Sequence, residues 1–153
     1  MLDKKLLEGI KDYDAFFDLS QKLSNYPKAE LFDFLFPIAI SCRSSCINGI
    51  AGYLLIDLEP KHTRSCSALL NEIAKSKWDV SNKEVPFYLV SQFGKWNLDK
   101  EIKDYIVGNK SIESELRAIE SIWYWASSPT ASLSEDLHYF EWQVAIEGEE
   151  LNA

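Results

Sequence analysis

The residues whose spacing could support metal chemistry are three cysteines and one histidine. Cys42 and Cys46 are four positions apart, and His62 and Cys66 repeat that separation further along the chain. On a helix, positions i and i+4 lie on one face, so two antiparallel helices could present four zinc ligands. Cysteine is also among the residues most often buried in cores, where it behaves as a small apolar group. We therefore predict core cysteines and no metal, with a zinc or thiol site at these four residues as the alternative.

Nucleophilic catalysis is the other chemistry that these residue types allow. It would pair a cysteine thiolate with His62 or His138 as the base. Neither histidine lies in a recognisable catalytic pattern. The sequence also contains no glycine-rich phosphate loop, zinc-protease helix or catalytic-triad signature. We therefore expect a protein that is not an enzyme and uses no cofactor.

The net charge of the chain is concentrated in residues 112–153. The whole sequence has a formal net charge of −8, and residues 1–111 contain equal numbers of acids and bases. The C-terminal part contains a single cation, Arg117, and nine carboxylates: Glu113, Glu115, Glu120, Glu135, Asp136, Glu141, Glu147, Glu149 and Glu150. An acidic surface repels nucleic acid and attracts basic proteins, so we expect a basic protein partner and no nucleic acid.

Three of the five tryptophans lie in this acidic part: Trp123, Trp125 and Trp142. The spacing predicts a helix over residues 112–126 with a core stripe at Ile112, Leu116, Ile119 and Trp123. Trp125 would then lie about 200° around the helix from Trp123, on its far side. In a last helix, Trp142 stands at the same angle from Phe140.

Two interpretations of the off-stripe tryptophans remain open. The first is a second packing face, because Ser114, Ala118 and Ser121 lie on the Trp125 side and are small enough to admit a neighbouring helix. The second is a protein-binding surface, in which aromatic anchors supply binding energy and the surrounding charge selects a basic partner. The predicted contact residues are Glu120, Tyr124, Trp125, Glu135, His138, Glu141 and Trp142.

Helical spacing of apolar residues predicts about eight short helices along the chain. The first covers residues 3–23 and has one apolar side: Leu6, Leu7, Ile10, Tyr13 and Phe17. The next begins at Tyr26-Pro27 and is kinked at Pro37. Further helices are expected over residues 47–58, 66–73, 82–93, 98–107, 112–126 and 132–144. Ser81 to Glu84 predicts a capping box, and Asn97 a cap for the helix that follows.

The expected fold is a single all-α domain over residues 1–153, built of stacked helical hairpins with an acidic part at 112–153. The segments around 85–94 and 116–128, each with a proline near a helix end, resemble HEAT-type repeat helices. The alternative is an α+β domain with strands at 52–58, 86–90 and 141–147, because periodicity does not distinguish short apolar helices from strands. The apolar stretch 34–56 is interrupted by Arg43 and polar residues, so no membrane span is expected.

In size, acidity, aromatic content and lack of catalytic motifs, the chain resembles small bacterial immunity proteins. That resemblance implies a protein that binds and blocks a basic toxin of the nuclease type, whose phosphate-binding lysines and arginines an acidic surface could match. The odd number of cysteines and the lack of a secretory signal indicate the cytoplasm. A HEAT-like adaptor subunit of a protein complex is a second possibility.

Overall fold

The computed structural model describes residues 2–41, 47–80, 83–108 and 112–127. Every regular element in these residues is helical and none is a strand, which confirms the all-α prediction. The elements are η1 (Lys4–Leu7), α1 (Tyr13–Leu23), α2 (Lys28–Ala39), α3 (Ile47–Leu58), α4 (Cys66–Lys75), α5 (Glu84–Phe93), α6 (Lys95–Gly108) and α7 (Glu113–Ala126). The α+β alternative is wrong for residues 52–58 and 86–90, which lie in α3 and α5, while 141–147 lie outside the described residues.

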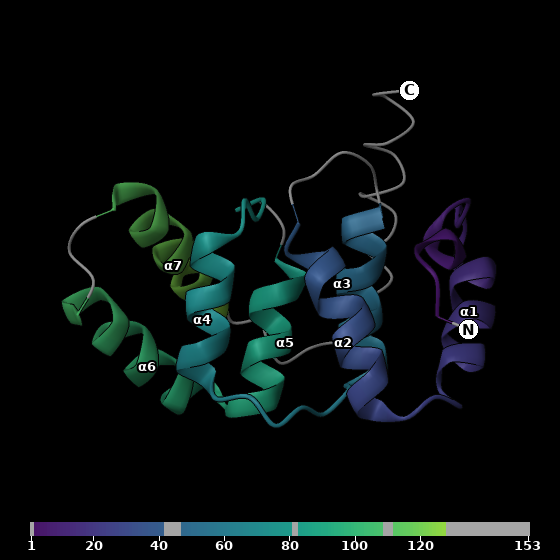
Figure 1. The fold of residues 1–153 in the computed structure, drawn as a ribbon, viewed down its shortest axis with the longest axis horizontal. Coiled ribbons are helices and arrows are strands. Elements are labelled where there is room, and N and C mark those ends of the chain that lie inside the picture. Colours follow the sequence, from purple (N-terminus) through teal and green to yellow (C-terminus); the bar gives the residue numbers. More distant parts are fainter. Residues whose placement is uncertain (1, 42–46, 81–82, 109–111, 128–153) are drawn as a thin grey trace.

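The helices form a row of stacked hairpins, with α1 at one end and α6 and α7 at the other (Figure 1). Helix α3 packs against η1, α1, α2 and α5, and α7 packs against α4, α5 and α6. No helix in the described ranges is long and apolar enough to cross a membrane.

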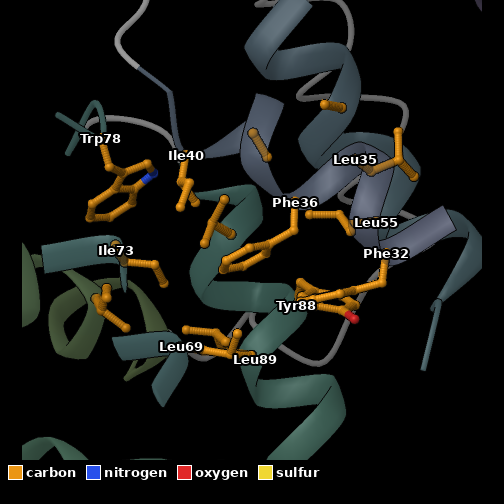
Figure 2. Packing of buried hydrophobic residues seen from close by; sticks show 14 of the residues in the cluster. Phe32, Leu35, Phe36, Ile40, Leu55, Leu69, Ile73, Trp78, Tyr88 and Leu89 are labelled. Atoms are coloured by element: carbon orange, nitrogen blue, oxygen red, sulfur yellow. The ribbon is translucent and has the colours of Figure 1, made fainter. Parts of the chain in front are cut away.

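The core is a continuous cluster of aromatic and aliphatic side chains from η1, all seven α-helices and the adjoining turns. At its centre, the ring of Phe32 stacks on that of Phe36, with 4.9 Å between centroids, and lies 6.2 Å from the ring of Tyr88 (Figure 2). Trp78 lies beside Ile40 at the edge of this cluster and is almost fully buried. The described residues therefore enclose one extended apolar core.

The single helix predicted over residues 3–23 is wrong, because two shorter elements occupy that segment. Asp3 caps η1 by accepting the Lys5 N–H, and Asp12 caps α1 by accepting the Ala15 N–H at 2.7 Å. Between them Gly9 adopts φ +76°, a left-handed conformation that glycine tolerates and that interrupts a helix.

This interruption changes which aromatic residues of the segment enter the core. Phe16 is buried at 3% exposure, whereas Phe17, expected in the apolar stripe, is 48% exposed. Tyr13, which was placed in the same stripe, is 40% exposed and stacks on Phe17.

Two predicted caps also differ from the structure. Helix α6 begins at Lys95, directly after Gly94 at φ +80°, so Asn97 lies inside its first turn and does not cap it. The Asn97 side-chain amide instead donates to the Phe93 carbonyl at 3.1 Å. Helix α5 begins at Glu84, which is later than the predicted capping box would start it. Ser81 and Asn82 lie outside the described residues.

Two phenylalanines provide a matched test of the core. Phe36→Ala removes a fully buried ring and leaves a cavity, so we expect it to lower the free energy of unfolding by about 3–5 kcal/mol. Phe17→Ala removes the same group from an exposed position and should cost less than about 1 kcal/mol. Urea denaturation of the full chain measures both values. Equal losses would contradict this assignment of the core.

Candidate protein-binding surface

Helix α7 turns a different side to the core from the one predicted. Its buried residues are Ala118, Ile119, Ile122 and Ala126, and Leu116 and Trp125 pack partly against the same cluster. The predicted stripe is therefore wrong for Trp123, which is 46% exposed, and for Ile112, which is 49% exposed. The physical reason is that α7 contacts three helices, α4, α5 and α6, so its buried side is wide and centred near Ala118 and Ile122.

Trp125 is held in place by two contacts outside α7. Its indole N–H donates to the carbonyl of Val80 at 2.9 Å, and the Nζ atom of Lys83 lies 5.2 Å from its ring centroid. Both partners belong to the segment that leads into α5. These contacts fix the indole against the body of the protein and give Trp125 a packing role.

Tyr124 is 66% exposed and rests on this fixed indole. Its ring meets the Trp125 ring edge-on, with 5.1 Å between centroids and 74° between planes. Glu120, Trp123 and Tyr124 are all exposed, and they occupy positions i, i+3 and i+4 on one side of the helix. We call Glu120, Trp123 and Tyr124 the α7 surface. It presents two large rings beside a carboxylate.

Of the predicted contact residues, the structure brings together Glu120, Tyr124 and Trp125 on α7. Glu135, His138, Glu141 and Trp142 lie outside the described residues. Trp123 was missed, because Ile112, Leu116, Ile119 and Trp123 gave an equally regular stripe. The four-residue spacing of Ala118, Ile122 and Ala126 is the signal in the sequence that corresponds to the observed core side.

The charge on α7 is acidic, and part of it has a local explanation. Glu113 and Glu115 lie in the first turn, where carboxylates interact favourably with the positive end of the helix dipole. Glu120 lies beyond the reach of that effect, beside the exposed rings.

His62 and Cys66 do not form the helical pair that the zinc alternative requires. Helix α4 begins at Cys66, capped by Ser65, so His62 lies in the connection before the helix and does not share a face with Cys66. Burial, with a smaller contribution from Glu101, raises the pKa of the Cys66 thiol to about 12. A neutral thiol is a poor nucleophile. Cys42 and Cys46 lie outside the described residues. Within the described residues, no three or more His, Cys, Asp or Glu side chains are grouped so that they could hold a metal ion.

His62 is packed among aromatic rings. Its ring centroid lies 4.5 Å from that of Phe32 and 5.5 Å from that of Phe93, and its Nδ1 atom accepts the Arg64 N–H at 3.2 Å. It lines a hollow together with Glu59 and Ser91, residue types that occur in hydrolases. The bond to Nδ1 places the ring proton on Nε2, whereas the base of a serine hydrolase needs Nδ1–H and a free Nε2. The arrangement therefore does not match that chemistry.

Comparison with protein-family models, with curated proteins and with solved structures finds no match to this chain.

His62 makes the stability of the protein depend on pH. Desolvation lowers its pKa below the usual value of 6.5, against a smaller opposing contribution from the Arg64 backbone hydrogen bond. The unfolded chain therefore takes up this proton first as the pH falls. The stabilisation is fully present above pH 6.5 and decreases as the pH falls through and below that value.

The His62→Gln variant lacks the titrating imidazole but keeps every carboxylate of the wild type. A comparison of the two proteins therefore separates the effect of His62 from that of the carboxylates. We expect the difference in urea midpoint between wild type and variant to shrink in acid, measured between about pH 5 and pH 8. Parallel pH curves for the two proteins would refute this role of His62.

The Trp125 hydrogen bond can be tested by Trp125→Phe. This change keeps a ring in place but leaves the Val80 carbonyl without its donor, so we expect a loss of about 1–3 kcal/mol in the free energy of unfolding. Trp123→Phe is the matched control at an exposed position and should change stability by less than about 0.5 kcal/mol. Guanidinium denaturation of both variants gives the comparison. A neutral Trp125→Phe would rule out a structural role for the indole N–H.

Proposed function

We propose that this protein acts in the cytoplasm as a non-enzymatic binding protein whose α7 surface engages a basic protein. The observation that carries the proposal is the exposure of Trp123 and Tyr124 beside Glu120, with Tyr124 supported by the fixed ring of Trp125. A solvent-facing helix does not need two large rings for its own stability. Binding is a use that accounts for them.

The chemistry of the α7 surface suits protein recognition. Tyrosine and tryptophan offer a large contact area at low entropic cost, because each has only two side-chain torsions to fix. The contact with Trp125 further restricts Tyr124 before any partner arrives. Glu120 can pair with a lysine or arginine of the partner, which raises the encounter rate and favours basic surfaces over acidic ones.

The concrete form that we propose is an immunity protein that blocks a nuclease-type toxin. A nuclease active site holds basic side chains that bind phosphate, and an acidic surface can occupy that site in place of the substrate. The predicted contact residues Glu135, His138, Glu141 and Trp142 would extend the acidic surface. The abundance of carboxylates in the C-terminal part supports this form of the proposal.

A HEAT-like adaptor is the second candidate. It is favoured by the row of stacked hairpins, an architecture that commonly offers extended binding surfaces. The two candidates differ in the nature of the partner, since an adaptor would hold a partner that has no toxic activity.

Affinity capture with the full chain tests the proposed function. We expect one basic partner at near one-to-one ratio, with retention that weakens between about 50 and about 200 mM salt. Glu120→Lys and Tyr124→Ala should each reduce capture by about tenfold or more, because each removes a central contact. Asp18→Lys and Phe17→Ala place matched changes on exposed positions of α1 and should leave capture unchanged.

The captured protein then distinguishes the two candidates. An immunity protein should suppress a nuclease activity of its partner, and the Glu120→Lys variant should suppress it less. A partner without such activity would support the adaptor. Capture that is equally strong with the α1 and α7 variants would refute the α7 surface as the binding site.

A further inference from the structure

Large apolar side chains that are exposed in the described part of the chain lie only at the two ends of the row of helices. Tyr13 and Phe17 lie on α1, and five others lie on α6, α7 or the residue before α7: Trp96, Val107, Ile112, Trp123 and Tyr124. Figure 1 shows that these two groups of helices stand at opposite ends. In a stack of helical hairpins, the helices at each end need a polar outer face, because an apolar one would associate with other molecules. At the α6–α7 end, exposed aromatic and aliphatic side chains interrupt the polar outer face.

The exposed side of α6 is regular and basic in its middle. Trp96, Lys100, Lys103 and Val107 are all exposed and follow one another at i, i+4, i+7 and i+11, so they form a single stripe. Trp96 is 75% exposed and Val107 71%. The neighbouring α7 surface has the opposite charge at Glu120. Asp104 on α6 and Arg117 on α7 are exposed as well, so each of the two helices carries exposed charges of both signs together with exposed apolar groups.

The hairpin geometry fixes which residues of the two helices lie at the same height. Helices α6 and α7 are consecutive and pack against each other, so we infer an antiparallel pair in which residues equally distant in sequence from their connection lie at similar heights. Lys100 is then level with Glu120, Asp104 with Arg117, and Trp96 with Tyr124, to within one residue. Opposite charges and aromatic rings therefore occupy matching heights on the two helices.

We propose that a second copy of this chain docks on the α6–α7 end through a two-fold symmetric contact. With the two-fold axis parallel to the helices, α6 of each copy lies against α7 of the other in antiparallel orientation. Residues at the same height then face each other across the interface, so Lys100 meets Glu120, Asp104 meets Arg117 and Trp96 meets Tyr124 of the partner copy. A self-complementary patch of this kind closes into a dimer and does not propagate into a filament.

The size of the contact indicates a weak dimer. Each helix has 14 residues and is therefore about 21 Å long, and two neighbouring helices span about 20 Å, which gives a footprint on the order of 400 Å² per copy. Stable interfaces bury about 800 Å² of accessible surface per partner. We therefore expect a dissociation constant in the micromolar range, with dimer and monomer both populated in solution. The α7 surface lies inside this contact, so a second copy would compete with the proposed basic partner, although the dimer does not depend on that function.

Sedimentation equilibrium of the purified full chain, with no partner present, tests the dimer. We expect a monomer–dimer equilibrium that weakens by about tenfold in high salt. Lys100→Glu and Glu120→Lys should each weaken it by about tenfold or more, because each places like charges opposite one another. The double variant Lys100→Glu/Glu120→Lys exchanges the two charges and should restore the dimer. Circular dichroism verifies that all variants fold.

Three results would overturn the proposal. A monomer at every concentration would mean that no second copy binds, and would leave residues 128–153 of the same chain as the candidate occupant of this end. Failure of the double variant to recover would show that Lys100 and Glu120 do not face each other. The third result is a wild-type protein that forms species larger than a dimer, together with a Phe17→Ser variant that no longer associates. That combination would indicate a head-to-tail contact between α1 of one copy and α6 of the next. All three readings are independent of whether a basic partner exists.

Discussion

The fold depends on the burial of α3 between its neighbours. Eight of its twelve residues are buried: Asn48, Ile50, Ala51, Gly52, Tyr53, Leu54, Leu55 and Leu58. A helix that is apolar nearly all round is stable in water only when other elements cover it, and η1, α1, α2 and α5 do so. Its polar groups are paired at both ends. The Asn48 amide donates to the Ile38 carbonyl at 2.8 Å, and the Asp57 carboxylate accepts the Ser20 hydroxyl. The positions of the neighbouring helices follow from this requirement.

The connection from α3 to α4 is fixed by the same group of helices. The Lys28 ammonium donates to the Leu58 carbonyl at 2.6 Å, the Tyr88 hydroxyl donates to the Pro60 carbonyl, and His62 packs on Phe32. Side chains of α2 and α5 thus bind one carbonyl at the end of α3 and one in the connection that follows it. This directs the chain into α4, against which α7 packs. Helix α7 packs on α5, and α5 packs on α3, so the α7 surface rests on the same core as α3.

Most helices were predictable because apolar spacing is strong wherever one side is buried, and α3 and α4 closely match the predicted segments. The predictions failed where a tertiary contact chose between equally regular patterns. On α7 two stripes were possible, and contact with three helices selected the one that exposes Trp123. At the N-terminus, Gly9 and the Asp12 cap interrupted a pattern that continued in sequence. The hydrogen bond from Trp125 to Val80 joins residues 45 positions apart, and no local spacing indicates it.

Exposed rings and opposite charges on one hairpin have a common physical consequence. Burying Trp96, Trp123 or Tyr124 against any apolar surface is favourable, so the apolar groups alone do not select a partner. Selection comes from the charges between them. A second copy offers both signs in matching positions, whereas a basic protein can satisfy Glu120 but meets repulsion at Lys100. A basic partner would therefore bind over α7 and leave α6 uncovered, while a second copy covers both helices. The lysines of α6 thus disfavour a basic partner over α6 and favour a second copy there.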